Sequence, residues 1–314
     1  MLHVGISSCL TGENVRYDGT HKVDNCILGT LGPHVKWVPV CPETESGLGV
    51  PREPMHLADV QGEIRLITND SGIDHTDRLQ SWSAGKVDEL KKHNIAGFIF
   101  KSRSPSSGLY DAKVYFSKSG LPARNETGLF ARMVLEKMPL LPVEDEEHLH
   151  DQGIRDNFIE RLFVFNRWKI YMQNDASLRG LQNFHSVHKL ILMSHSPAAL
   201  QKLGSMIASL HKKNMGKSMD LYGTGLMKTM KIMGTRQKHV NVLHHIAGYF
   251  KKQLSRVEKM ELNELIEKYR SNLLPRIVPI ILLNHYAVHY QQDYLLNQLY
   301  LNPDSDEILM KNHA

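Results

Sequence analysis

Long hydrophobic runs are absent from this 314-residue chain, and cysteine is scarce. No apolar run reaches the roughly 18 residues that a helix needs to cross a bilayer. The N-terminal segment also lacks the basic region and the longer apolar stretch of a signal peptide. We therefore expect a cytoplasmic protein that has no membrane partner. Three cysteines are too few for a disulfide framework, so any role for them depends on their surroundings.

Length, composition and charge suggest two dissimilar halves. A chain of 314 residues exceeds one ordinary domain. A proline followed by an acidic run at residues 144–147 marks a boundary, so we predict domains over residues 1–147 and 148–314. Residues 1–150 hold 16 Lys and Arg against 20 Asp and Glu, whereas residues 151–314 hold 22 against 13. The basic second half favours a polyanionic partner.

The first half alternates short apolar segments with helical patterns. Residues 2–9, 36–41 and 95–101 are typical of buried strands, and residues 74–92 and 128–137 are typical of helices. This alternation predicts an α/β domain with a mostly parallel sheet. In such sheets ligands bind beyond the carboxyl ends of the strands. All three predicted strands end in small, polar or sulfur-bearing residues, which therefore become candidate site residues.

The second half has few segments typical of strands, and most of it has the residue pattern of long helices. We therefore predict an all-α domain. Ser196 is expected to cap a helix that begins at Pro197. The predicted helical segments are residues 156–172, 181–193, 197–213, 218–233, 238–270 and 275–299.

Three motifs follow the three predicted strands. Cys9 with the nearby Arg16 is compatible with a plain turn, or with a metal ligand beside an anion-binding group. Cys41 and Glu43 stand two residues apart in a loop rich in glycine and proline, where they can supply a metal ligand and a general base. The third motif, residues 104–108, has the composition of an ordinary turn. The occurrence of all three motifs at successive strand ends favours a common site.

The segments SSCL, VRYDG, PVCPE, GLGVPREP and KSRSPSSG closely resemble the bacterial thiouracil desulfidase family. The second half resembles the YbgA-like helical domain. The fused arrangement is similar to the RudS-type proteins, which implies removal of sulfur from 4-thiouridine in tRNA. The segments that carry the second resemblance include residues 157–161, 188–190, 195–197, 238–243, 248–252 and 282–286.

The resemblance implies a [4Fe-4S] cluster that has three protein ligands and one open iron. Cys9 and Cys41 match two of the ligand positions, and Glu43 matches the glutamate that activates water. Either Ser104 or Ser106 matches the serine that assists proton movement or positioning. The residues that we expect to bind the substrate are Ser8, Arg16, Tyr17 and Arg52.

The third ligand position departs from the family. The family has cysteine there, whereas this chain has Ser107. A serine hydroxyl is a hard donor that stays protonated unless a metal displaces the proton, so it suits an iron–sulfur cluster less well than a thiolate. Three explanations stay open: a substitution introduced to trap an inactive form, a natural and weaker ligand, or replacement by Cys26. We expect the chain as written to hold a cluster poorly and to turn over slowly.

A basic stretch at residues 212–256 contains Asp220 as its only acidic residue. Such a stretch is compatible with a solvated helical face, but the lack of pairing acids favours contacts with phosphate. Tyr222, Tyr249 and Phe250 lie within it and either stack on bases or belong to the core. The residues that we expect to bind RNA are Lys212, Lys213, Lys217, Lys228, Lys231, Arg236, Lys238, Lys251 and Lys252.

The sequence therefore predicts a desulfidase that acts on 4-thiouridine in tRNA. A basic domain is needed if the thiolated base is part of a polynucleotide, because the enzyme must then hold the polynucleotide while it acts on the base. One alternative is the same chemistry on free thiouracil. Another is an RNA-binding protein that has lost catalysis through Ser107. We predict no obligate protein partner.

Overall fold

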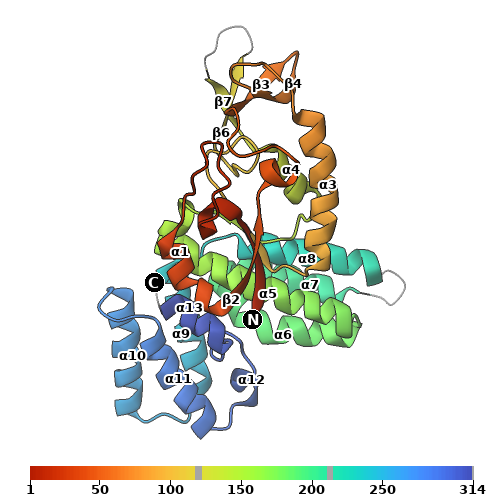
Figure 1. Ribbon diagram of the computed structural model, residues 1–314. Coiled ribbons are helices and arrows are strands. Elements are labelled where there is room, and N and C mark those ends of the chain that lie inside the picture. Colours follow the sequence, from red (N-terminus) through yellow and green to blue (C-terminus); the bar gives the residue numbers. More distant parts are fainter. Residues whose placement is uncertain (117–121, 211–214, 313–314) are drawn as a thin grey trace. The chain divides into compact units, whose positions relative to one another are not determined.

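The computed structural model describes residues 1–116, 122–210 and 215–312 (Figure 1). The chain divides into two compact units, one formed by Met1–Asn166 with Leu309–Ala314 and the other by Arg167–Ile308. The division falls within helix α5 (Gln152–Asn174). The boundary predicted between residues 147 and 148 separates two functional domains. A division into compact units does not test that boundary, so it stays a prediction.

Sheet A of the first unit confirms the predicted α/β fold with a parallel sheet. Its strands are β1 (Leu2–Ser7), β2 (Val35–Val40), β5 (Gly97–Phe100) and β8 (Val143–Asp145). They lie in the order β2-β1-β5-β8, and every neighbouring pair is parallel. The carboxyl ends of all four strands therefore meet at one edge of the sheet. Strand β8 escaped prediction because its acidic residues are typical of a linker.

A second sheet, sheet B, was not predicted from the sequence. It consists of β3 (Met55–Val60), β4 (Glu63–Thr68), β6 (Ala112–Phe116) and β7 (Pro122–Glu126), in the order β4-β3-β6-β7. Strands β3 and β6 are parallel, and the two outer pairs are antiparallel. The predicted helices are present as α3 (Thr76–Lys92) and α4 (Leu129–Lys137), which pack against each other (Figure 1).

Short helices complete the first unit around sheet A. They are η1 (Ser8–Thr11), α1 (Asn25–Thr30), η2 (Gly32–His34), α2 (Pro42–Glu45) and η3 (His148–His150). Two of these helices, η1 and α2, begin at the ends of β1 and β2. They therefore set the direction in which the residues after the strands leave the sheet.

The second half of the chain is helical, as predicted. Ser196 caps α7 (Pro197–Ala208) as expected, because its hydroxyl accepts a hydrogen bond from the Ala199 amide at 3.2 Å. The predicted segment 238–270 is interrupted by a turn, after which Ser255 and Glu258 form a capping box that starts a new helix. Among the described residues, no helix is both long and apolar enough to cross a membrane. The helices are α6 (Leu178–His195), α7 (Pro197–Ala208), α8 (Met215–Met230), α9 (Arg236–Ala247), η5 (Gly248–Phe250), α10 (Arg256–Arg270), α11 (Ile277–His289), α12 (Asp293–Leu296) and α13 (Ser305–Asn312).

Candidate active site

A cavity of about 630 Å³ lies at the carboxyl edge of sheet A. Its lining includes residues that follow each of the four strands, such as Cys9 after β1, Cys41 after β2, Lys101 after β5 and Glu146 after β8. Parallel strands place their following residues at the same edge, so segments far apart in sequence meet here. The three motifs found in the sequence thus contribute to one site.

Cys9 and Cys41 are buried, and neither is in a disulfide. Strands β1 and β2 are paired in register, with Ser7 opposite Val40. Each cysteine follows the last residue of its strand within two positions. Burial raises the pKa of Cys9 to about 11 and that of Cys41 to about 12, the latter also through the nearby Glu43 carboxylate. Both are therefore neutral thiols at neutral pH, and a metal must displace their protons in order to bind.

Cys26 is separated from these two thiols. It lies in the first turn of α1, its side chain is exposed, and it is not among the residues that line the cavity. Ser107, by contrast, is buried and lines the cavity with Cys9 and Cys41. Of the two candidates for the third ligand, Ser107 thus shares the cavity with Cys9 and Cys41, whereas Cys26 does not.

Glu43 presents its buried carboxylate to three neighbours. The Ser106 hydroxyl donates a hydrogen bond to Oε1. The Cys41 thiol lies 3.4 Å from Oε2, and Nη2 of Arg52 lies 3.9 Å from the same oxygen. Because α2 begins directly after Cys41, the chain itself fixes Glu43 close to this sulfur. These contacts fix the orientation of the carboxylate, and its role as a general base stays a prediction.

The three serines of the loop after β5 form a connected set. The Ser104 and Ser106 hydroxyl oxygens are 3.0 Å apart, and the Ser107 amide donates to the Ser104 oxygen at 3.1 Å. Ser104 and Ser107 line the cavity, whereas Ser106 is fully buried against Glu43. Gly128 packs so closely on this loop that a Cβ there would lie 2.5 Å from the Ser106 carbonyl carbon.

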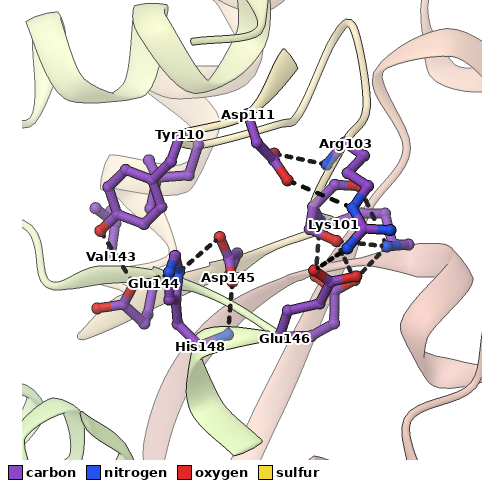
Figure 2. A network of polar contacts seen from close by, with 12 residues as sticks. Lys101, Arg103, Tyr110, Asp111, Val143, Glu144, Asp145, Glu146 and His148 are labelled. Carbon is purple, nitrogen blue, oxygen red and sulfur yellow. Dashed lines mark hydrogen bonds and ion pairs between the residues drawn. The ribbon is translucent and has the colours of Figure 1, made fainter. Parts of the chain in front are cut away.

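The same loop begins with a network of polar contacts that includes Lys101 and Glu146 (Figure 2). Glu146 forms an ion pair with the Lys101 ammonium and accepts hydrogen bonds from the Ser102 amide at 2.7 Å and the Ser102 hydroxyl at 2.8 Å. The Lys101 amide donates to the Ser7 hydroxyl at 2.9 Å, which joins the ends of β5 and β1. Neither charged residue was among the predicted site residues: Lys101 was predicted to end a strand, and Glu146 follows β8, which was not predicted.

All four residues that were predicted to bind substrate line the cavity, namely Ser8, Arg16, Tyr17 and Arg52. The Arg16 guanidinium lies 5.6 Å from the centre of the Tyr17 ring, and Tyr17 is 41% exposed. Arg52 donates to the Val15 carbonyl at 2.9 Å, so its position is fixed by the backbone. The structure gathers these side chains, while their roles stay predictions.

The residues that were predicted to bind RNA fall into three groups. Arg236 and Lys238 are occupied by the protein itself: Arg236 donates to the Tyr269 carbonyl at 2.7 Å, and Lys238 donates to the His195 and Met233 carbonyls, each at 2.9 Å. Lys212 and Lys213 lie outside the described residues. The remaining five are exposed, namely Lys217, Lys228, Lys231, Lys251 and Lys252.

Comparisons with known proteins find relatives for both halves of the chain. The 2-thiouracil desulfurase family matches residues 4–146, and DUF1722, a family of unknown function, matches residues 189–305. The uncharacterised protein YbbK of Bacillus subtilis is 35% identical over 108 residues, which are 33% of this chain and 71% of YbbK. The uncharacterised protein YbgA of Escherichia coli K12 is 27% identical over 150 residues, which are 48% of this chain and 89% of YbgA.

Among solved structures, a [4Fe-4S]-dependent thiouracil desulfidase, TudS, shares 28% identity. The match covers 48% of this chain and 95% of TudS, with a TM-score of 0.39. The fold and the cavity define an α/β domain whose buried cysteines share one site with a carboxylate. The chain belongs to the 2-thiouracil desulfurase family, with a DUF1722 domain in its second half. Both resemblances found in the sequence are thus confirmed.

Proposed function

We propose that this chain hydrolyses the thiocarbonyl group of a thiolated uracil, and that its substrate is 4-thiouridine within tRNA. Water supplies the oxygen of the new carbonyl group, and the sulfur leaves as hydrosulfide with one proton released. The main support is the meeting of Cys9, Cys41 and Glu43 in one cavity of a desulfurase-family domain.

The donor atoms at the cavity fit an iron–sulfur cluster. Cys9 and Cys41 supply two thiolates, and Ser107 supplies an oxygen donor at the same cavity. Among the described residues, no three His, Cys, Asp or Glu side chains are grouped to hold a metal ion. We propose Ser107 as the third ligand because it lines the same cavity as the two cysteines. When bound, the cluster supplies an iron that accepts the sulfur of a thiocarbonyl group. Because oxygen is a harder donor than sulfur, we propose that the cluster is held weakly here.

The protein's own residues would handle water and protons. Glu43 takes a proton from the attacking water, and the Ser106 hydroxyl holds the carboxylate in place. Ser104 orients Ser106 through the contact of their hydroxyl groups at 3.0 Å. Arg16, Tyr17 and Arg52 lie at the cavity to hold the base.

The choice of tRNA over a free base is supported by the second half of the chain. Five exposed lysines, at positions 217, 228, 231, 251 and 252, lie in a stretch whose only acidic residue is Asp220. Clustered cations of this kind favour phosphate contacts, which a free nucleobase does not offer. Free thiouracil is the second candidate substrate because the cavity is lined entirely by residues of the first unit.

The test measures the 4-thiouridine left in tRNA after anaerobic incubation with iron- and sulfide-reconstituted protein, beside its Ser107→Cys variant. We expect the Ser107→Cys variant to consume 4-thiouridine and the chain as written to do so slowly. Cys26→Ser is the matched control and should change neither result, because Cys26 is exposed and away from the cavity. If neither protein consumes 4-thiouridine while both bind tRNA, the chain is an RNA-binding protein without desulfidase activity. Consumption of free thiouracil alone would favour the second candidate.

A further inference from the structure

Three aromatic residues of the basic stretch differ in their accessibility. Tyr222 and Phe250 are fully buried, and the Tyr222 hydroxyl is hydrogen-bonded to His185 at 3.0 Å, so both belong to the core of the helical unit. Tyr249 is 37% exposed. Of these three rings, Tyr249 is the one that an external ligand can reach.

The turn between α9 and α10 explains this difference. Phe250 packs against Tyr286 at a ring distance of 5.9 Å, and Leu254 is buried four residues further on. These two residues fix the inner side of the turn. Lys251 and Lys252, which stand between them, are exposed. The turn therefore presents an aromatic ring and two adjacent ammonium groups at the surface.

Tyr249 is supported from behind by a second ring. Its ring and that of Tyr294, in α12, are stacked with centres 5.5 Å apart and planes inclined by 19°. The exposed His245 ring, in α9, meets Tyr249 edge-on at 5.7 Å. Because three elements hold these rings, little conformational freedom is lost when another flat ring stacks on them.

The two lysines that follow Tyr249 in the turn favour an anionic partner. In the described part of the chain, neither Lys251 nor Lys252 forms an ion pair with a carboxylate. Flat aromatic rings beside unpaired cations match the two chemical parts of a nucleotide, since bases stack on aromatic side chains while phosphates contact lysine. A double-stranded helix keeps its bases stacked internally, so the complementary ligand is an unpaired nucleotide.

We propose that Tyr249 and Tyr294, with Lys251 and Lys252, form a binding surface for a single-stranded segment of RNA. A base stacks on Tyr249, and the two lysines contact the phosphates next to it. The inference rests on the proposed RNA substrate and specifies which part of the RNA the helical unit recognises. It assigns the helical unit a role that does not depend on the cavity or on a cluster.

The test measures binding of the full-length, metal-free chain to a labelled uridine-rich single-stranded RNA and to a blunt RNA duplex. Tyr249→Ala should weaken single-strand binding about tenfold, and Tyr249→Phe should restore it because the ring is kept. Removing two phosphate contacts by Lys251→Gln with Lys252→Gln should lower the slope of log affinity against log salt by about 1.4. The matched controls are Phe116→Ala, an exposed ring, and Lys91→Gln with Lys92→Gln, an exposed adjacent pair; all three residues lie in the other unit.

Several outcomes would overturn the inference. They are equal binding by Tyr249→Ala and the parent, an equal loss on single-stranded and duplex RNA, and binding of anionic lipid vesicles through the same residues in place of RNA. Thermal unfolding of each variant, with Tyr249→Phe as the conservative change, shows whether a loss comes from misfolding. Because the metal-free chain is used, absence of desulfidation leaves this result readable. Absence of any RNA binding overturns the inference and leaves activity on free thiouracil to be tested by itself.

Discussion

The hydroxyl group of Ser106 donates a hydrogen bond to the carboxylate of Glu43, although the two residues are 63 positions apart in the sequence. Glu43 follows β2 and Ser106 follows β5, with β1 lying between these strands in the sheet. The contact therefore crosses the carboxyl edge of sheet A at the cavity. It links the candidate base to the serine loop that carries Ser107, the predicted third ligand.

The first prediction concerns Glu43 as the general base. In the Ser107→Cys variant, Glu43→Gln should lower kcat about 100-fold or more, because an amide cannot take a proton from water. Iron content after reconstitution should stay unchanged, since Glu43 is not a ligand. The measurement is single-substrate kinetics on thiouracil together with iron analysis. Glu53→Gln serves as the control, because Glu53 lies at the cavity but its carboxylate accepts hydrogen bonds from the Asp70 and Ser71 amides. A kcat equal to that of the parent would remove Glu43 from the mechanism.

The second prediction separates Ser106 from Ser104. In the same Ser107→Cys background, Ser106→Ala removes the donor to Glu43 and should lower kcat about tenfold, within the range seen for supporting contacts at metal sites. Ser104→Ala should have the smaller effect because Ser104 contacts Ser106 and the Ser107 amide, not the carboxylate. The two variants are compared by kcat and KM at the same iron content. A larger effect of Ser104→Ala would transfer the serine role to that residue.

The third prediction follows from the burial of the cysteines. A thiol that has a pKa of about 11 is ionised roughly 100-fold less at pH 8 than one at the ordinary value of 9.0, and only the thiolate is alkylated. In the metal-free chain, iodoacetamide should therefore modify the exposed Cys26 first and Cys9 and Cys41 much later. Raising the pH increases the thiolate fraction of both buried residues and should accelerate their reaction. Mass spectrometry of the modified peptides gives the three rates, and equal rates would contradict the burial of the pair.

The predictable parts of this fold were those with strong local patterns. Apolar segments ending in Cys9, Cys41 and Lys101 identified three strands of sheet A, and their parallel arrangement brought the motifs together as expected. Strand β8 was missed because Glu144 and Asp145 are acidic, and the charge of Glu144 is balanced by a residue outside the strand. The Glu144 carboxylate is paired at 3.0 Å with Arg161 from α5. Such compensation between distant residues leaves no periodic signal in the sequence.

Sheet B escaped prediction for a related reason. Neither β3 nor β4 alternates regularly between buried and exposed residues, and both strands contain charged side chains. Arg65 in β4, for instance, lies 3.6 Å from Asp74 and from Asp77. In the helical unit the sequence could not decide between core and surface for Tyr222 and Tyr249, because both stand in the same basic stretch. Contacts with Trp168 and His185 bury Tyr222, whereas Tyr249 stays exposed beside the buried Phe250.

The last prediction concerns Glu146, the carboxylate that holds the start of the serine loop. It is 5% exposed, and its replacement by Gln leaves the Lys101 ammonium without its ion-pair partner in a largely buried place. Breaking a buried pair by removing one partner is strongly destabilising, by about 3 kcal/mol. Glu147→Gln is the matched control: Glu147 pairs with Arg103 of the same loop at 2.8 Å, but both side chains are exposed, so the loss should be below about 1 kcal/mol. Urea unfolding of the metal-free chain measures both changes. Equal effects of the two substitutions would mean that burial of the Lys101–Glu146 pair does not hold the loop against the ends of β1 and β5.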